Sequence, residues 1–204
     1  MKRMANQISN GVDQFNIVIC GVGGQGLITL NKILVHTAIS EGYEAKTSEL
    51  HGLSQRGGSV ETHIRFGQKI YSPLVKKGGA DLIISIEAQE ALKASYYASK
   101  KAGTVFLINE FIAPLPTVEP IPIKKISEAL KDFSKEVLII PATEITQKEL
   151  GNSVLAGMYL LGVASAKNLI PLKPSSLLKI MEEIVPKQFF DLNKKTFELA
   201  KKNA

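Results

Sequence analysis

The sequence predicts an α/β protein with three layers, in which helices cover both faces of a mixed, mostly parallel β-sheet. Short β-branched apolar segments alternate with helical patterns between residues 16 and 140. The 204 residues are 45% hydrophobic and 22% charged, which suits one domain with a sizeable core. Residues 151–204 carry helical patterns alone. We therefore expect a single domain over residues 1–204, with a helical C-terminal part packed on it.

The first elements are expected to be a strand, a glycine turn, a helix and a second strand. Residues 1–14 lack an apolar run and are interpreted as a lead-in. Asn16–Cys20 is an apolar run that ends at glycines, as a buried strand does. Apolar side chains then recur at helical spacing from Leu27 and stop near Gly42. Residues 44–50 follow as a strand, which we expect to pair in parallel with the first through a right-handed crossover.

The next segments predict a mixed sheet. Residues 59–66 alternate apolar and polar side chains, which predicts a half-exposed strand that is antiparallel or at the sheet edge. Residues 81–86 and 104–108 read as parallel strands, with a helix over residues 87–101 between them.

A proline-rich connector separates these elements from the C-terminal part. Four prolines between residues 114 and 122 exclude a helix there and favour an extended connector. A helix over residues 124–134 and a last strand over residues 137–140 follow. The remaining helices are expected over residues 142–150, 153–168, 175–185 and 187–202.

A glycine-rich loop follows the first predicted strand and begins the first helix. Gly21-Val-Gly-Gly-Gln-Gly26 matches the pattern G-x-G-x-x-G in the structural context that gives this pattern its meaning. Glycines allow a tight turn, and the free N–H groups at the start of a helix can hold a phosphate or pyrophosphate. The alternative is that the glycines only let the helix pack closely on the sheet. The candidate ligand-binding residues here are Gly21, Gly23, Gly24, Gln25 and Gly26.

A second glycine-rich segment leaves the identity of the ligand open. A dinucleotide site needs an acidic residue about 20 positions after the loop, and Glu49 could serve. The following segment, residues 51–58, instead suits a second anionic group or a partner surface, because Arg56 can grip a carboxylate or phosphate with two hydrogen bonds. Alternatively, Arg56 tethers the segment to a neighbouring carboxylate. The candidate residues here are Ser54, Gln55, Arg56, Gly57 and Gly58.

The remaining polar candidates suggest no catalytic residue and no metal site in this chain. Cys20 ends a buried strand and reads as a core residue, and a single cysteine cannot hold an iron–sulfur cluster. His36 lies inside the first helix and reads as structural or surface-exposed, while His51 and His63 have no metal-binding spacing with the cysteine. Glu87 follows a strand and is either a charge at a helix N-terminus or a contact to a partner.

Four segments together resemble the gamma-type domain of the 2-oxoacid:ferredoxin oxidoreductases, a Rossmann-like domain. They are Gly21–Gly26, His51–Val60, Ala80–Glu87 and Asn152–Gly157, and the resemblance runs nearly end to end. The His-Gly-x-x-Gln-Arg-Gly-Gly form is similar to the small (beta) subunits of the indolepyruvate branch, whereas the 2-oxoglutarate branch usually carries Tyr-Gly-x-Glu-x-Arg-Gly-Gly. Ala200 stands where the closing helix of that family usually has a glycine.

The resemblance implies an accessory subunit of an enzyme that oxidatively decarboxylates aryl 2-oxoacids, forms acyl-coenzyme A and reduces ferredoxin. Thiamine diphosphate, Mg²⁺ and 4Fe–4S clusters are then expected in a large (alpha) partner subunit. The sequence agrees, because it has one cysteine and no Gly-Asp-Gly thiamine motif. This chain is expected to be inactive alone and to help bind coenzyme A through Gly21–Gly26.

Other functions remain open from the sequence. The chain could act on another 2-oxoacid (pyruvate, 2-oxoglutarate or a branched-chain acid), bind nucleotides alone, or serve as a regulatory or assembly protein.

The net charge of +6 is spread as lysine pairs without a run of basic residues, which favours a solvated surface over a nucleic-acid site. With no signal peptide and no long apolar segment, a cytoplasmic location and no membrane contact are expected.

Overall fold

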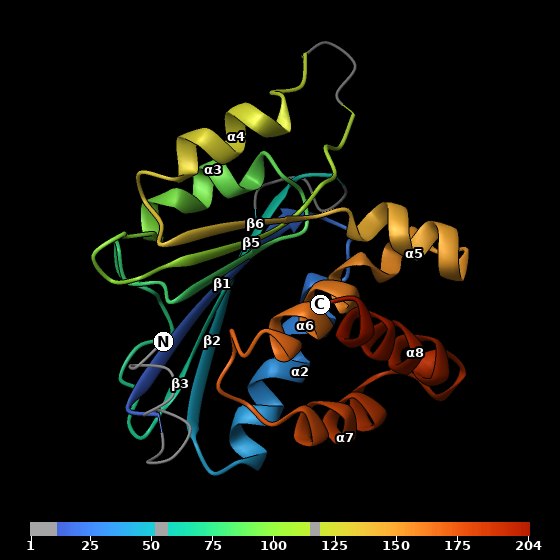
Figure 1. Cartoon of the computed structure of the whole chain (residues 1–204). Coiled ribbons are helices and arrows are strands. Elements are labelled where there is room, and N and C mark those ends of the chain that lie inside the picture. The colour runs from blue at the N-terminus through green and yellow to red at the C-terminus, as the bar shows by residue number, and fades with distance from the viewer. Residues whose placement is uncertain (1–11, 52–56, 115–118) are drawn as a thin grey trace.

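The fold is built on a six-stranded mixed sheet with the strand order β2-β3-β1-β4-β5-β6 (Figure 1). The computed structural model describes residues 12–51, 57–114 and 119–204. The strands are β1 (Gln14–Val22), β2 (Glu44–His51), β3 (Ser59–Gly67), β4 (Leu82–Ser85), β5 (Val105–Asn109) and β6 (Glu136–Ile140). Within the described residues, β1, β4, β5 and β6 are parallel, while β3 is antiparallel to β1 and β2.

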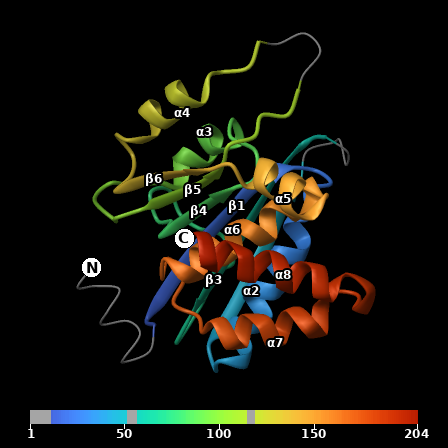
Figure 2. The same cartoon turned by 45° about the vertical axis from the view of Figure 1, so that its right-hand side comes forward.

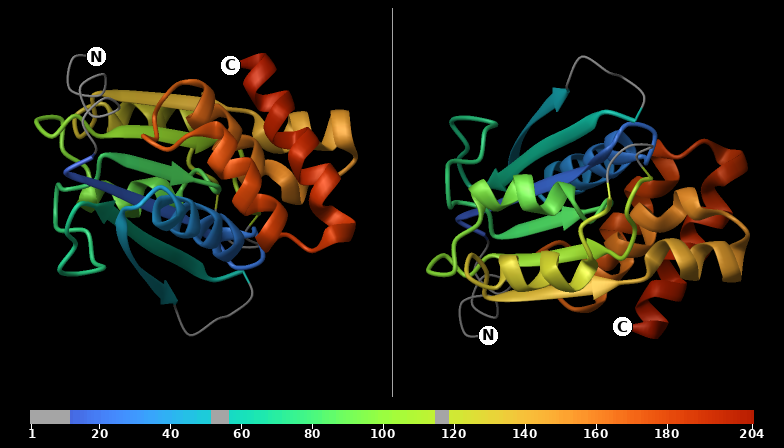
Figure 3. Two further views of the ribbon diagram at one scale, coloured as in Figure 1. Left: turned by 90° about the horizontal axis from the view of Figure 1, so that it is seen from below. Right: turned by 90° about the horizontal axis from the view of Figure 1, so that it is seen from above.

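Helices cover both faces of this sheet, which confirms the three-layer prediction (Figures 1 and 2). One face carries α3 (Glu90–Ala94) and α4 (Ile123–Leu130). The other carries α2 (Leu27–Ser40), α6 (Ala156–Ala166), α7 (Pro174–Ile184) and α8 (Lys187–Asn203). In Figure 3 the red α8 lies outside the orange α6. Shorter elements complete the chain: η1 (Ser95–Tyr97), α5 (Ala142–Leu150) and η2 (Ser153–Leu155).

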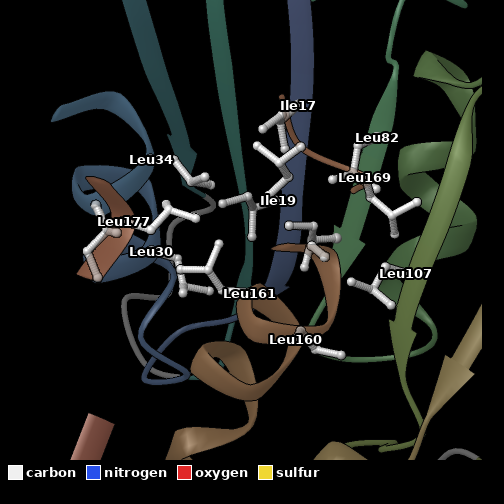
Figure 4. Close-up of a cluster of buried hydrophobic side chains, with 14 of the residues drawn as sticks. Ile17, Ile19, Leu30, Leu34, Leu82, Leu107, Leu160, Leu161, Leu169 and Leu177 are labelled. Atoms are coloured by element: carbon white, nitrogen blue, oxygen red, sulfur yellow. The ribbon is translucent and has the colours of Figure 1, made fainter. Parts of the chain in front are cut away.

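The central strands β1, β4 and β5 are buried on both faces, so successive side chains enter different cores. Ile17 and Ile19 of β1 point into the large core beneath α2 and α6, as Figure 4 shows. Val18 and Cys20 point the opposite way, into the smaller core beneath α3 and α4. Full burial stabilises each large apolar side chain by about 1.5–3 kcal/mol relative to exposure. Because these strands carry apolar side chains on both faces, the sheet is held between two layers of helices.

The expected direct pairing of the first two strands is wrong. β3 lies between β1 and β2, so that Ile64 faces Ile17 on one side and Thr47 on the other. The short connection between β2 and β3 brings β3 back antiparallel beside β2, and β3 then occupies the position next to β1. The antiparallel orientation expected for residues 59–66 is confirmed, but β2 rather than β3 forms the edge.

The helix expected over residues 87–101 is also wrong in length. α3 ends at Ala94 and continues only as the 3₁₀ turn η1, after which Ala98 is extended. The hydroxyl of Ser95 donates to the carbonyl of Leu92 at 2.7 Å, a local bond that competes with further helical turns. The C-terminal helices follow the prediction closely, and α8 continues through Ala200 to Asn203. In the described part of the chain, no helix has the length and apolarity needed to cross a membrane.

Candidate functional site

The glycine loop lies at the carboxyl end of β1, where two neighbouring parallel strands lead into helices on opposite faces of the sheet. β1 leads into α2 on one face, whereas its parallel neighbour β4 leads into α3 on the opposite face (Figure 1). In open α/β sheets, ligands bind in the crevice that this divergence opens at the carboxyl ends of the strands. The loop thus occupies the position at which this type of fold places its binding sites.

The loop is a tight turn closed by its own glutamine. The side-chain Oε1 of Gln25 accepts a 2.9 Å hydrogen bond from the N–H of Val22. Gly24 and Gly26 have φ angles of +100° and +79°, in the left-handed region that costs other residues about 1–2 kcal/mol. Backbone conformation therefore favours glycine at both positions.

Unpaired N–H groups line the start of α2. Gly26 precedes the helix without a side-chain cap. Within the described part of the chain, no acceptor is found for the N–H groups of Gly24, Gly26, Leu27 and Ile28. Such groups, together with the partial positive charge of a helix N-terminus, are able to bind an anion.

The packing alternative holds for one glycine of the loop. A Cβ atom at Gly21 would lie 2.6 Å from the Oε1 of Gln25 and 3.3 Å from Leu27, so Gly21 is needed for close packing. A Cβ atom at Gly24 or Gly26 would meet nothing within 4 Å. These two glycines therefore leave open space in front of the helix N-terminus.

The second glycine segment reaches the loop through its last residues. The N–H of Gly23 donates a 2.9 Å hydrogen bond to the carbonyl of Gly58, and Gly57 has a φ angle of +69°. Ser54, Gln55 and Arg56 lie outside the described residues. The structure thus brings together the two predicted segments at Gly23 and Gly58.

Two cavities flank the glycine loop. The larger, of about 340 Å³, is bounded by Gln25 and Gly26, by the corner between α7 and α8, and by the start of α6. The smaller, of about 150 Å³, lies beside Gly24 and Thr143. Val154 of η2 borders both. Sequence reasoning missed the larger cavity, although its wall includes part of the Asn152–Gly157 segment.

Glu87 is a structural anchor. Its carboxylate accepts hydrogen bonds from the N–H of Glu90 at 2.9 Å and of Ala113 at 3.1 Å. The side chain is only 2% exposed, so no partner can reach it directly. Of the two readings, the charge at a helix N-terminus is confirmed.

Cys20 is a core residue, as predicted. Its thiol is buried and donates to the hydroxyl of Ser85 at 3.1 Å, and Ser85 donates to the carbonyl of Glu87 at 2.6 Å. Burial raises the pKa of the Cys20 thiol far above its ordinary value. A thiol held in the protonated form is neither a good nucleophile nor a metal ligand.

Glu49 does not lie where a ribose-binding acid would lie. Its carboxylate accepts a 3.0 Å hydrogen bond from the side-chain amide of Asn31 on α2. Asn31 also accepts from the hydroxyl of Thr47 at 2.8 Å. In a dinucleotide site the acidic residue follows the strand next to β1, but here β3 takes that place. The arrangement therefore argues against the stand-alone dinucleotide-binding alternative.

The described histidines are structural or exposed. His63 is buried, with its Nε2 2.8 Å from Glu61 and its Nδ1 accepting from the N–H of Val75 at 2.9 Å. The ring of Tyr97 packs against it edge-on at 4.7 Å. His36 lies exposed on α2. The described residues contain no group of three or more acidic, histidine or cysteine side chains that could hold a metal ion.

The fold and the loop define an α/β domain with a glycine-rich turn at the crevice between β1 and β4. Residues 16–202 match the family model described as pyruvate ferredoxin/flavodoxin oxidoreductase. The chain therefore belongs to this family of 2-oxoacid oxidoreductases.

Several similar proteins carry one name. The "Indolepyruvate oxidoreductase subunit IorB" of Thermococcus kodakarensis is 36% identical over 200 residues, which covers 94% of this chain and 96% of that protein. The protein of the same name from Pyrococcus horikoshii is 35% identical with the same coverage. That from Archaeoglobus fulgidus is 30% identical over 91% of this chain and 93% of its own length.

Solved structures show the same fold at lower identity. The gamma subunit of keto/oxoacid ferredoxin oxidoreductase from Geobacter sulfurreducens superposes with a TM-score of 0.68 at 21% identity, covering 92% of this chain and 96% of that one. The 2-oxoglutarate:ferredoxin oxidoreductase from Magnetococcus marinus, solved with 2-oxoglutarate, coenzyme A and succinyl-CoA bound, gives 0.70 at 19% identity. This chain covers only 30% of that longer chain, while 93% of this chain is aligned.

Proposed function

We propose that the chain is the small, gamma-type subunit of an enzyme that oxidatively decarboxylates aryl 2-oxoacids, such as indolepyruvate. The enzyme would transfer the acyl group to coenzyme A and two electrons to ferredoxin. Family membership over residues 16–202 supports the reaction class. The name shared by relatives of 30–36% identity supports the aryl substrate.

The role of this chain within the enzyme is to hold the phosphates of coenzyme A. One observation carries this assignment: unpaired N–H groups at the start of α2 surround open space at the switch point of the sheet. Pyrophosphate fits such a turn because several N–H groups and the helix dipole favour its charge together. The net charge of +6 adds a weak general attraction for an anionic coenzyme.

Thiamine diphosphate, Mg²⁺ and 4Fe–4S clusters belong, in this proposal, to the large (alpha) subunit. The residues of this chain do not fit a cluster, because its single cysteine, Cys20, is buried and bonded to Ser85. No step of the redox chemistry is assigned to this chain. Its contribution is to bind and orient coenzyme A, and the isolated chain is expected to be inactive.

Joint production with the large subunit tests the class of enzyme. The two chains should purify as one complex that reduces ferredoxin in the presence of coenzyme A and a 2-oxoacid. We expect indolepyruvate and phenylpyruvate to be used better than pyruvate, 2-oxoglutarate or a branched-chain 2-oxoacid. A preference for one of the last three would overturn the substrate assignment, and failure to form a complex would overturn the subunit assignment.

A pair of glycine substitutions tests the binding site. Gly24→Asp places a carboxylate at the open turn, and we expect the KM for coenzyme A in the complex to rise at least tenfold by charge repulsion. Gly42→Asp is the matched control, because Gly42 also has a positive φ angle and open space, but lies at the far end of α2. An equal effect of both substitutions, or no effect of either, would contradict phosphate binding at this loop.

Arg56 is proposed to grip a second anionic group, either a phosphate of coenzyme A or a carboxylate of the large subunit. Arg56→Ala should raise the KM for coenzyme A in the first case and weaken the complex in the second. If neither quantity changes, Arg56 has no role in binding.

A further inference from the structure

Two lysine-containing connections meet at the end of the sheet opposite the glycine loop. Residues 68–80 lead into β4 and residues 95–103 lead into β5, so both lie at the amino ends of parallel strands, at the left in Figure 1. The N–H of Gly78 donates a 3.1 Å hydrogen bond to the carbonyl of Tyr96 and thereby joins them. The two connections therefore form one continuous surface, which we call the lysine surface.

The lysine surface holds most of the net charge of the chain. Its basic side chains are all exposed, and they are Lys69, Lys76, Lys77, Lys100 and Lys101. The two connections contain no acidic residue, so five of the six positive charges in the net charge of +6 lie here. Within the described residues, none of these lysines forms an ion pair. Such a surface attracts a partner of opposite charge and raises its rate of association.

Exposed rings and one apolar side chain lie among these lysines. Tyr71 is 79% exposed, Leu74 48% and Tyr96 57%. The Nζ of Lys69 lies 5.1 Å from the centre of the Tyr71 ring, and the Nζ of Lys77 lies 5.6 Å from that of Tyr96. Tyrosine is enriched at protein interfaces because its ring offers contact area and its hydroxyl a polar group. The surface therefore combines charge with a small area suited to direct contact.

The longer connection is held in place on β3. The N–H of Val75 donates to the Nδ1 of the buried His63 at 2.9 Å. The guanidinium of Arg65 donates to the carbonyls of Ser72 at 2.7 Å and Leu74 at 3.3 Å. A surface that is already ordered loses less conformational entropy when a partner binds.

The composition of the surface favours a transient protein partner. Nucleic-acid sites favour arginine, but Arg65 is bonded to backbone carbonyls and the exposed cations are lysines. One face of each exposed ring is covered by a lysine ammonium, so that face is not free to stack on a base. Permanent interfaces are depleted in lysine, whereas short-lived encounters depend on charge and bury less area.

We propose that the lysine surface is the contribution of this chain to the docking site of a small acidic electron-carrier protein. The inference rests on the proposed function, since the carrier would be the ferredoxin that the enzyme reduces. The surface guides and holds the carrier at the complex, and electron transfer itself is left to the large subunit. The docking surface is thus at the opposite end of the sheet from the glycine loop.

Reversal of charge in the two-subunit enzyme tests the docking surface. The double variant Lys76→Glu/Lys77→Glu should raise the KM for an acidic ferredoxin at least tenfold, because attraction becomes repulsion. The KM for coenzyme A and the rate with methyl viologen as electron acceptor should stay unchanged, since neither uses this surface. The matched control is Lys201→Glu/Lys202→Glu, which makes the same change of charge at an exposed pair in the last turn of α8.

Salt provides a second measurement that needs no variant. The KM of the wild-type complex for ferredoxin should rise between about 0.05 M and 0.5 M NaCl, because salt screens exposed charges. In the Lys76→Glu/Lys77→Glu complex this rise should be absent. A KM that depends equally on salt in the two complexes would contradict docking at the lysine surface.

The remaining outcomes separate this proposal from the proposed function. If both double variants leave the KM for ferredoxin unchanged while methyl viologen is reduced normally, the docking surface is wrong and the proposed function stands. If the wild-type complex reduces neither acceptor with any 2-oxoacid, the proposed function itself fails.

Two further results would assign the surface to another partner and overturn the proposal. One is a weaker two-subunit complex in Lys76→Glu/Lys77→Glu with an unchanged KM for ferredoxin, which would place the large subunit there. The other is binding of a single-stranded RNA oligonucleotide by the wild-type complex that the same variant abolishes, again with an unchanged KM for ferredoxin.

Discussion

The N–H of Gly23 donates a 2.9 Å hydrogen bond to the carbonyl of Gly58, and this bond joins two glycine-rich segments that are far apart in the sequence. It extends the antiparallel pairing of β1 and β3, whose last matched residues are Val22 and Ser59. The contact exists because β3 rather than β2 is the neighbour of β1. The insertion of β3 thereby places the second glycine segment against the candidate phosphate turn.

The positive φ angles of the turn predict a moderate loss of stability on substitution by alanine. Gly24→Ala and Gly26→Ala each force a side chain into the left-handed region, at about 1–2 kcal/mol, but neither added methyl group meets an atom within 4 Å. We expect the melting temperature to fall by about 2–8 °C without loss of the fold. Thermal denaturation followed by circular dichroism measures this.

Gly42→Ala is the control for these substitutions. Gly42 has a φ angle of +88° and open space around its Cα, so the loss of stability should be similar. Only Gly24→Ala and Gly26→Ala, however, should also raise the KM for coenzyme A in the complex. A change in KM with Gly42→Ala of the same size would show that strain, and not the site, controls binding.

Glu87→Gln is expected to destabilise the protein by about 1–3 kcal/mol. Both carboxylate oxygens accept backbone N–H groups, from Glu90 and Ala113, and an amide can supply only one acceptor there. Chemical denaturation measures the change in the free energy of unfolding, and Glu110→Gln, at an exposed position, is the control. Equal losses of stability for Glu87→Gln and Glu110→Gln would contradict the anchoring role of Glu87.

Local patterns in the sequence were sufficient for most elements, but not for their arrangement. The apolar run ending at Cys20 and the glycines after it define β1 and the turn, because both depend on neighbouring residues. The position of β3 between β1 and β2 depends on pairing between distant residues, which no local pattern records. The end of α3 at Ala94 reflects a competing hydroxyl bond of Ser95.

The candidate site divides in the same way. The glycines of the turn could be predicted, because strained backbone conformations select glycine directly. Phe189 and Asn193 could not, since they reach the cavity only through the corner between α7 and α8 and carry no motif of their own. Whether Glu49 could bind a ribose also depended on topology. Its distance from Gly26 along the sequence suits a dinucleotide site, but its strand, β2, is not a neighbour of β1.

The contact between α6 and α8 predicts a difference between two helical glycines. A Cβ atom at Gly162 would lie 2.6 Å from the Cβ of Ala200 and 2.7 Å from the carbonyl oxygen of Phe197, which is rigid backbone. At Gly157 the nearest atom is the terminal methyl of Leu30 at 2.8 Å, which can move.

Gly162→Ala should therefore destabilise the protein by about 1–3 kcal/mol, as overpacking does. Gly157→Ala should be near neutral, because alanine gains about 0.8–1.0 kcal/mol in helix propensity. Ala200→Gly should recover only part of the loss in the Gly162→Ala protein, since the clash with Phe197 remains. Urea denaturation measures the free energy of unfolding of the wild type, the two single variants and the double variant. Equal losses of stability in Gly162→Ala and Gly157→Ala would contradict rigid α6–α8 packing.

Tyr97 predicts a specific loss of stability in alkaline solution. Burial, together with a hydrogen bond to Glu61, raises the pKa of Tyr97 from 10.0 to about 12. The neutral phenol is thus favoured in the folded protein. The free energy of unfolding that this preference adds is fully present below the unfolded pKa of 10.0, and it is lost as the pH rises from about 10 to about 12. Tyr97→Phe should lose less stability than the wild-type protein between about pH 9 and pH 11.5. The midpoint of urea unfolding at the two pH values measures this. Tyr71→Phe, at a residue that is 79% exposed, is the control and should lose as much as the wild type; an equal loss in Tyr97→Phe would contradict the raised pKa.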